Sequence, residues 1–224
     1  MDLLFTPAKL GTCELKNRIV RSATNGHLSD EKGQVTPLWA DTLIELAKNE
    51  VGLVIPGHFC VDKMQRADAG QPVLDETTDE SLLRRACDGV HRYGGKLFFQ
   101  LSHSGIKGVE SVNGAPPKHP EDFTREELDR LVEQFAFAAK KCKESGADGV
   151  QVSGIDFNRR AGQKTPFYLD ALICEPDFAA KLKSGAQDGS KCLACNGCYT
   201  IYRKRFVRCV QHQDEIEQFK TIPW

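Results

Sequence analysis

The sequence has no surplus of charge of either sign. Its 30 Lys and Arg residues stand against 31 Asp and Glu residues, which leaves a formal net charge of −1 at pH 7. Without a basic excess, the chain has no general attraction for nucleic acid or for an anionic membrane surface. Neither is therefore expected as a partner.

The sequence also lacks the segments that direct a protein out of the cytoplasm. No apolar stretch approaches the roughly 18 residues that a membrane-spanning helix needs. The first stretch, Met1–Pro7, has neither the basic start nor the long apolar run of a secretory signal. These absences predict a cytoplasmic protein.

Nine cysteines are present, and their positions divide them into two groups. Single cysteines occur within predicted strands and helices, where reduced, half-buried thiols are expected; they are Cys13, Cys60, Cys87, Cys142 and Cys174. The other four crowd the C-terminal end, at Cys192, Cys195, Cys198 and Cys209. In a chain without an export signal, such a cluster predicts a metal site before it predicts disulfides.

Most of the chain alternates strand-like and helix-like segments. The strand-like segments are apolar and lie at residues 17–24, 51–55, 96–101 and 147–152. The helix-like segments between them have recognisable starts, which are Thr36 before Pro37, a Thr77-x-x-Glu80 capping box and a Thr124-x-x-Glu127 capping box. Residues 1–18 predict a short hairpin that turns at Gly11.

This alternation predicts an α/β fold with a parallel sheet. The strands are apolar on both faces, as in a sheet covered by helices or closed into a barrel. Periodicity does not separate a barrel from an open doubly wound sheet, but no G-x-G-x-x-G loop follows the first strand, which disfavours a Rossmann domain. After residue 154 the pattern stops. We therefore divide the chain into residues 1–154, which hold the βα units, and a Cys-rich remainder, residues 155–224.

The first part of the chain contains several short motifs whose order along the sequence can be compared with that of known families. They are Leu4-Phe5-Thr6-Pro7, Leu15-Lys16-Asn17-Arg18-Ile19-Val20, the stretch from Gly94 to Gly105, and Ser145-Gly146-Ala147-Asp148-Gly149-Val150. Together they resemble the FMN-dependent NADH:flavin oxidoreductase or old yellow enzyme family, with its 2,4-dienoyl-CoA reductase-like members. The resemblance implies a TIM (β/α)8 barrel, which usually needs about 250 residues. Here it implies an incomplete barrel of about four N-terminal βα units and a Cys-rich C-terminal tail.

The chain departs from the family pattern beyond the fourth strand. The segment Ile173–Phe178, a Lys-Ser-Gly and the C-terminal cysteines resemble the family's end, and only residues 153–172 separate them from the fourth strand. Val152-Ser153-Gly154 stands where the family has a His-x-x-Asn or His-x-x-His pair that holds the substrate carbonyl. The family's two late phosphate-binding loops are also missing, so the catalytic residues stay unassigned.

The resemblance implies positions for the flavin at the carboxyl ends of the strands. Ser22, Ala23 and Thr24 would line the FMN from the first strand, Gly57 would let the ring approach, and Gln100 would hydrogen-bond its pyrimidine edge. Carboxyl ends of barrel strands are where ligands bind, which agrees with these positions. His58 and His103 follow strand ends and either face a substrate or are surface histidines.

The C-terminal cysteines carry the second predicted site. Two successive C-x2-C steps bring the thiolates of Cys192, Cys195 and Cys198 together, and Cys209 completes a set of four. Related reductases of the family use a similar tail, with slightly longer spacing, for a [4Fe–4S] cluster. Zinc is the competing metal for these four cysteines. The third alternative is that all four remain free thiols.

Two functional hypotheses follow. In the first, the chain is an FMN-binding oxidoreductase that passes hydride from NAD(P)H through the flavin to an activated, α,β-unsaturated alkene as its small-molecule substrate. In the second, it is a non-catalytic, truncated family member or a metal-binding module that does not hold FMN. In either case the open edges of an incomplete barrel predict association into a homo-oligomer.

Overall fold

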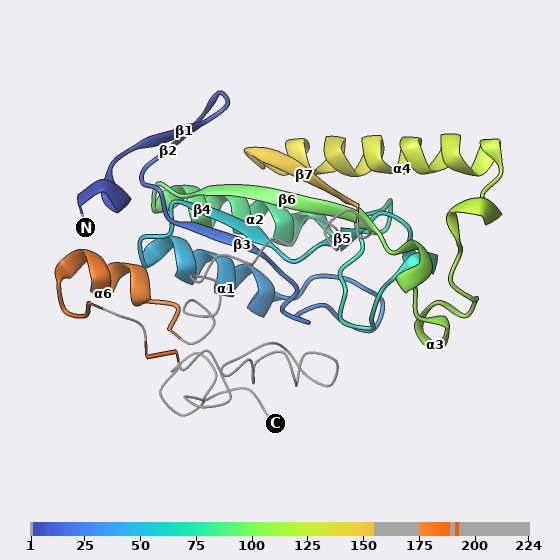
Figure 1. Ribbon diagram of the computed structural model, residues 1–224, viewed down its shortest axis with the longest axis horizontal. Helices are drawn as coiled ribbons and strands as arrows, with labels where there is room; N and C mark the ends of the chain where they lie inside the picture. The colour runs from blue at the N-terminus through green and yellow to red at the C-terminus, as the bar shows by residue number, and fades with distance from the viewer. Residues whose placement is uncertain (1, 155–174, 189–190, 193–224) are drawn as a thin grey trace.

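The computed structural model describes residues 2–154, 175–188 and 191–192 (Figure 1). The strands are β1 (Ala8–Leu10), β2 (Cys13–Leu15), β3 (Val20–Thr24), β4 (Leu53–Pro56), β5 (Phe59–Cys60), β6 (Lys96–His103) and β7 (Gly149–Gly154). The α-helices are α1 (Pro37–Lys48), α2 (Glu80–Arg92), α3 (Glu110–Asn113), α4 (Arg125–Glu144) and α6 (Phe178–Ser184). Short 3-10 helices are η1 (Asp2–Phe5), η2 (Lys63–Gln65), η3 (Gly105–Lys107) and η4 (Pro120–Asp122).

The main sheet is parallel, as the alternation of strands and helices predicts. Its order is β3-β4-β6-β5, and β7 pairs with β6. The short strand β5 follows directly after β4 and also pairs with β6, with Phe59 opposite Leu101. Strands β1 and β2 form the predicted antiparallel hairpin, and its turn uses Gly11 at φ 59°.

Two of the three predicted helix starts are confirmed. The Thr36 hydroxyl accepts a hydrogen bond from the Trp39 backbone N–H at the start of α1, and Pro37 occupies the first turn. At the start of α4, the Glu127 N–H donates to the Thr124 hydroxyl at 3.2 Å. The Thr124 N–H in turn donates to the Glu127 carboxylate at 2.9 Å, which completes the capping box.

The capping box expected at Thr77 is wrong, because Asp79 caps α2 instead. The Asp79 carboxylate accepts the Ser81 N–H at 2.8 Å. The Thr77 hydroxyl donates to Asp75 at 2.6 Å, and the Glu80 carboxylate pairs with Lys141 at 3.5 Å. A carboxylate two residues nearer the helix outcompetes the hydroxyl for the exposed N–H groups.

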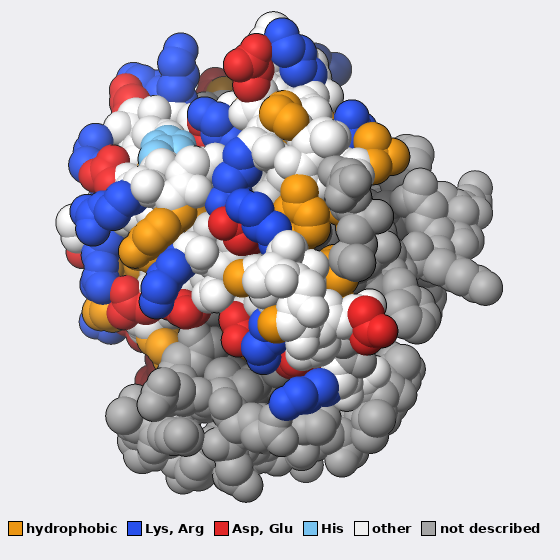
Figure 2. All heavy atoms as spheres, turned by 90° about the vertical axis from the view of Figure 1, so that its left-hand side faces the viewer, with side chains coloured by type: hydrophobic (Ala, Val, Ile, Leu, Met, Phe, Trp, Pro, Cys, Tyr) orange, Lys and Arg blue, Asp and Glu red, His pale blue; other side chains and the backbone are white. Residues whose placement is uncertain are grey.

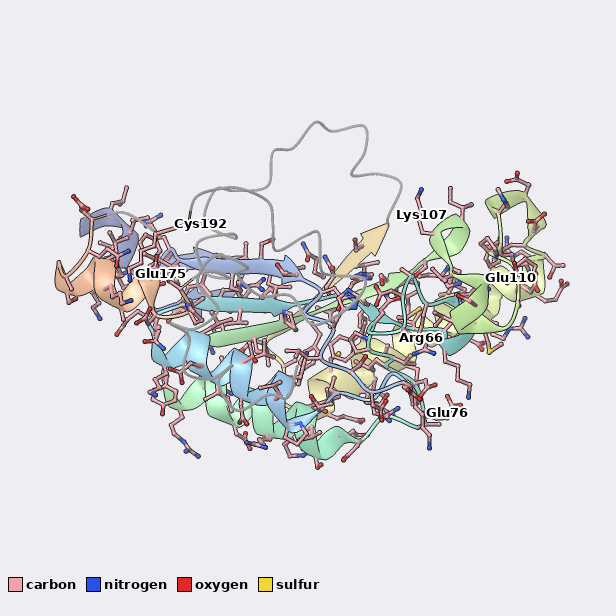
Figure 3. The ribbon with its side chains drawn as sticks, turned by 90° about the horizontal axis from the view of Figure 1, so that it is seen from below. Arg66, Glu76, Lys107, Glu110, Glu175 and Cys192 are labelled. Atoms are coloured by element: carbon pink, nitrogen blue, oxygen red, sulfur yellow. The ribbon has the colours of Figure 1, made fainter. Side chains whose placement is uncertain are left out.

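The main hydrophobic core lies between one face of the sheet and the helices. Figure 3 shows α1 and α2 on one side of the strands. At the centre of this core, the ring of Trp39 lies 5.7 Å from that of Phe59, which is 5.4 Å from that of Phe99. Aromatic rings at such spacings contribute packing energy beyond the area that they bury. The helices α1 and α2 thus pack against one face of the sheet, and a separate set of residues lies on the other face.

The opposite face of the sheet has a smaller apolar cluster. It contains Leu53 and Ile55 of β4 and Leu15 of β2, with Phe98 of β6 packed against them. Residues alternate between the two faces along a strand, so Phe98 and Gln100 share this face while Phe99 points into the main core. In a closed barrel, this face would be the interior.

The charged surface is mixed in sign. Figure 2 looks onto the end of the molecule where the β1–β2 hairpin and α6 lie, and it shows Lys and Arg beside Asp and Glu. Ion pairs on this end include Lys9 with Glu14 at 3.0 Å and Lys183 with Glu50 at 3.0 Å. This mixture agrees with the balanced composition of the sequence.

Within the described ranges, no helix combines the length and apolar character needed to cross a membrane. The predicted division at residue 154 stays a prediction, because residues 155–174 lie outside the described part of the chain.

Candidate active site at the carboxyl ends of the strands

The parallel strands bring the predicted flavin contacts to one end of the sheet. Thr24 ends β3 and pairs with Pro56, which precedes Gly57. The registers of β4 and β5 with β6 put Gly57 at about the level of Gln100. The structure therefore brings together positions that are far apart in the sequence. This end of the sheet is also where parallel barrels place their active sites.

The end of β3 is irregular. Its register with β4 shifts between Arg21 and Thr24, as at a β-bulge, and Ser22, Ala23 and Thr24 are all half-buried. The Ser22 carbonyl accepts hydrogen bonds from the Arg21 guanidinium at 2.6 Å and from the Thr24 hydroxyl at 3.3 Å. A bulge re-aims side chains next to it, which suits a segment expected to line a ligand.

Gly57 is needed for a close approach within the chain itself. A Cβ atom at this position would collide with Asn25 Cα and would lie 2.7 Å from the Thr24 carbonyl oxygen. The glycine therefore lets the end of β4 pass against the backbone that follows β3. Its predicted role at the flavin stays a prediction.

Gln100 lies on the face of β6 opposite the main core and is joined to a second amide. Its Nε2 donates to Oε1 of Gln151 on β7 at 2.9 Å. The two residues are direct register partners, so their side chains project from the same face. Sequence reasoning missed Gln151, although the parallel pairing of the third and fourth strands would have suggested it.

A buried polar network adjoins these amides, and sequence reasoning also missed it. Ser102 lies two residues beyond Gln100 on β6, and its hydroxyl is 2.9 Å from His58 Nδ1. The Gln71 amide nitrogen lies 2.7 Å from the same Nδ1 and 3.3 Å from the Ser102 oxygen. The Gln71 carbonyl oxygen accepts the Ala67 N–H at 2.6 Å and a bond from Ser104 at 3.4 Å. Because Gln71 and Ser102 are fully buried, this network is ordered by the protein and not by solvent.

The loop between β3 and α1 adds a second histidine, His27, to this end of the sheet, and the loop between β5 and α2 adds Asp68. His27 Nδ1 lies 3.2 Å from the Asp68 carboxylate, which also accepts a hydrogen bond from Asn25 at 3.0 Å. Burial lowers the pKa of His27 against the opposing attraction of Asp68. Burial also lowers the pKa of His58; Asp68 opposes this change, and His27 adds to it.

His103 has a local structural role. Its Nδ1 accepts the Gly105 N–H at 3.1 Å, and its ring lies edge-on to Phe123 with 5.7 Å between centroids. Burial lowers the pKa of His103, with Asp62 acting in the opposite direction. Of the two histidines singled out from the sequence, His58 is the one that belongs to the polar network beside Gln100.

The predicted metal site falls mostly outside the described residues. Of its four cysteines only Cys192 is described, half-buried near the C-terminal side of α6, whereas Cys195, Cys198 and Cys209 are not. Figure 3 places Cys192 beside Glu175, at the end of the molecule opposite Arg66. Among the described residues, no group of three or more His, Cys, Asp or Glu side chains is placed to hold a metal ion.

The scattered cysteines behave as the sequence predicts where they are described. Cys60, Cys87 and Cys142 are buried, and burial raises the pKa of each thiol to about 12. Cys13 is half-buried with its pKa raised by burial, and Cys174 lies outside the described ranges. Protonated, buried thiols of this kind are chemically inert.

The family relationship covers the part of the chain that forms these strand ends. Residues 3–156 match the NADH:flavin oxidoreductase / NADH oxidase family. The chain is 34% identical over 169 residues to a metal reductase of Desulforamulus reducens, covering 68% of this chain and 24% of that protein. It is 30% identical over 162 residues to an NADPH dehydrogenase of Listeria monocytogenes, covering 68% and 48%. The chain thus matches about a quarter to a half of the length of these relatives.

Solved structures share the arrangement of strands and helices. An old yellow enzyme homologue from Zymomonas mobilis superposes with a TM-score of 0.59 at 22% identity, over 66% of this chain and 47% of that one. Old Yellow Enzyme from Pichia sp. AKU4542 gives a TM-score of 0.61 at 19% identity, over 79% and 54%. The predicted fold, an incomplete TIM barrel with its N-terminal βα units, is therefore confirmed. The chain belongs to the NADH:flavin oxidoreductase / NADH oxidase family.

Proposed function

We propose that this chain binds FMN at the carboxyl ends of its strands and acts in an oxidoreductase that carries hydride from NAD(P)H to an activated, α,β-unsaturated alkene. The observation that carries the proposal is the pair of amides, Gln100 and Gln151, on the sheet face opposite the main core. Ser22, Ala23 and Thr24 lie at the same end of the sheet, at positions that the family resemblance assigns to the flavin.

The described residues suit the ring of FMN. A flavin ring needs an apolar surface to lie against and polar groups along its pyrimidine edge. Ile55 and Phe98 are apolar side chains on this face, and the amides of Gln100 and Gln151 offer both donors and acceptors. When bound, FMN supplies the two-electron hydride chemistry, and the protein supplies binding, orientation and exclusion of water.

The names of the relatives support the choice of donor and acceptor. An NADH oxidase of Thermoanaerobacter brockii is 28% identical over 165 residues, and the Listeria relative is an NADPH dehydrogenase. A cinnamate reductase of Clostridium sporogenes is 28% identical over 172 residues. Reduced nicotinamide as donor and a conjugated alkene as acceptor are thus both represented among the relatives. They are what we propose for this chain.

The test of the flavin site is the affinity for FMN of the full chain and of a Gln100→Ala variant, measured by quenching of flavin fluorescence. Loss of one or two amide hydrogen bonds predicts a dissociation constant about three- to tenfold higher. Gln134→Ala on α4 is the matched control and should bind as the unmodified chain does. Equal affinity of all three proteins would contradict the proposed position of the flavin.

For the C-terminal cysteines, we propose a metal site formed by Cys192, Cys195, Cys198 and Cys209, with a [4Fe–4S] cluster as the preferred occupant and zinc as its competitor. Four thiolates suit either occupant. Iron, sulfide and zinc would be measured after anaerobic reconstitution of the full chain. Cys192→Ser should lower metal retention and Cys13→Ser should not, whereas a chain that retains no metal would refute this part of the proposal.

A further inference from the structure

His58 is held at one edge of its ring by two side chains. Its Nδ1 faces Gln71 and Ser102. The described residues form no hydrogen bond to Nε2, at the opposite edge of the ring. This nitrogen therefore has no partner within the described part of the chain.

The orientation of Gln71 decides which nitrogen of His58 carries the proton. A backbone N–H is always a donor, so the Ala67 N–H, 2.6 Å from Gln71, fixes that end of the amide as the carbonyl oxygen. The NH2 group of Gln71 then faces His58 Nδ1 at 2.7 Å and donates to it. Because Nδ1 accepts, neutral His58 must carry its proton on Nε2.

The same contact disfavours the charged imidazolium. Protonation would place an N–H on Nδ1 directly against the NH2 of Gln71, so two donors would face each other. The charged and titratable groups around His58 are Asp68, which favours the imidazolium, and His27, which opposes it. Burial, together with His27, outweighs Asp68 and lowers the pKa of His58. His58 is thus built to stay neutral while it carries one N–H on the ring edge away from Gln71.

The position of this N–H suits a ligand that lies over Gln100. Ser102 and Gln100 are two residues apart on β6 and share a face, which separates them by about 7 Å along the strand. His58 contacts Ser102 and directly follows Gly57 at the end of β4. These contacts place His58 beside the region that a molecule stacked on a flavin at Gln100 would occupy.

We infer that His58 is a substrate-binding residue, whose Nε2–H donates a hydrogen bond to a carbonyl or carboxylate oxygen of an α,β-unsaturated substrate. The inference rests on the proposed function for the identity of the ligand. It supplies a donor at a site where the sequence has no His-x-x-Asn or His-x-x-His pair after the fourth strand. A donor in this place draws electron density toward the oxygen and polarises the conjugated alkene.

The first arm of the test reads the tautomer and does not depend on FMN. The six histidines of the full chain would be labelled with 15N, and the His58 signals would be identified by their loss in a His58→Gln variant. We expect a neutral ring with the proton on Nε2 at pH 7, and protonation at a lower pH than for an exposed histidine. A proton on Nδ1, or an imidazolium at pH 7, would overturn the inference.

A substitution at Gln71 that exchanges the hydrogen-bond donor for an acceptor gives a second test of the tautomer. Gln71→Glu keeps the shape of the side chain and replaces the donor that faces Nδ1 by an acceptor. We expect His58 in this variant to gain a proton on Nδ1 and to titrate at higher pH than in the unmodified chain. Gln134→Glu adds the same charge on α4 and should leave the His58 signals unchanged. An unchanged His58 in Gln71→Glu would contradict the assigned orientation of the amide.

The second arm uses trans-cinnamate as the probe, with the full chain saturated with FMN. We expect cinnamate to shift the Nε2–H signal of His58 and to bind about tenfold more weakly to His58→Phe. His58→Gln retains an amide donor near the same place and should recover most of the affinity. Cinnamate binding that leaves the His58 signals unchanged would overturn the inference. Failure to bind FMN would instead refute the proposed function and leave the tautomer result standing.

Discussion

Among single residues, Asp148 ties together the amino ends of β6 and β7 and the helix α2. Its carboxylate accepts hydrogen bonds from Lys96 at 2.8 Å, from His91 at 2.6 Å and from the Leu97 N–H at 2.9 Å. Burial on its own would raise the pKa of Asp148, but these bonds outweigh burial and lower it below its ordinary value of 3.8. The ionised form is therefore a stabilising part of the folded chain.

This residue gives a pH-dependent prediction. A carboxyl with a depressed pKa in the folded state contributes stability above its unfolded pKa and loses it as the pH falls through the folded value. We expect Asp148→Asn to lower the free energy of unfolding by about 2 to 3 kcal/mol at pH 7, measured by urea denaturation. The difference should shrink as the pH falls below 3.8. Asp129→Asn, in an exposed pair with Arg125, should change stability by less than about 1 kcal/mol, and an equal effect of both variants would refute this account.

Gly57 gives a second prediction at the residue scale. A Cβ atom there would meet the backbone of Asn25 and Thr24, which is not free to move aside as a side chain would. We expect Gly57→Ala to destabilise the fold by about 3 kcal/mol and to weaken FMN binding, because the ends of β3 and β4 must separate. Gly114→Ala is the comparison, since its φ of 71° costs about 1 to 2 kcal/mol while no atom lies within contact distance. If Gly114→Ala proved the more damaging, the close approach at Gly57 would not be a packing constraint.

At the scale of elements, the helix starts show how far the sequence can be read. A hydroxyl followed three residues later by Glu identified the start of α4 correctly. The same pattern failed at Thr77, because it does not reveal that Asp79 is better placed to accept the first N–H groups of α2. Local motifs predict the presence of a helix more reliably than the residue that caps it.

The cap of α4 gives a prediction that distinguishes Thr124, which caps a helix, from Thr77, which does not. Thr124→Ala removes a hydroxyl that accepts the Glu127 N–H, and we expect it to lower the free energy of unfolding by about 1 kcal/mol. Thr77→Ala should cost less, because the Thr77 hydroxyl caps no helix. Urea denaturation of both variants measures the difference, and a larger cost at Thr77 would reverse the assignment of the caps.

The candidate positions that could be proposed from the sequence are those on the parallel strands. Apolar patterning and family motifs located Ser22, Thr24 and Gln100, because a parallel sheet brings the ends of its strands together. The His58–Gln71–Ser102 network was not predictable in this way. It depends on the loop after β5 folding back so that the buried amide of Gln71 reaches β6. The periodicity of apolar residues does not predict a contact that a loop makes with a distant strand.

For the molecule as a whole, the side of the sheet formed by β7 carries exposed apolar side chains. Val152 of β7 is 67% exposed, Val132 of α4 is 68% exposed, and Leu128, Phe137 and Val150 are also exposed. Among the described strands, β7 pairs only with β6, and no described strand pairs with its outer edge beside this apolar surface. Association between copies of the chain through this edge, which the sequence also predicts, stays a prediction.

Sedimentation velocity tests this association. We expect the full chain to sediment as a dimer or larger species at micromolar concentration, and Val152→Lys to shift it toward the monomer, because a charge on an edge strand opposes pairing. Leu10→Lys, on the exposed β1–β2 hairpin, is the matched control and should not change the distribution. A monomeric unmodified chain would refute the prediction.

The central claim is that the carboxyl ends of these strands form a flavin site. The most direct test is the visible absorption spectrum of the full chain, mixed with FMN and then desalted. We expect the flavin band to be retained with the protein and to bleach when NADH or NADPH is added without oxygen. A colourless protein after desalting, with all FMN in the small-molecule fraction, would contradict it.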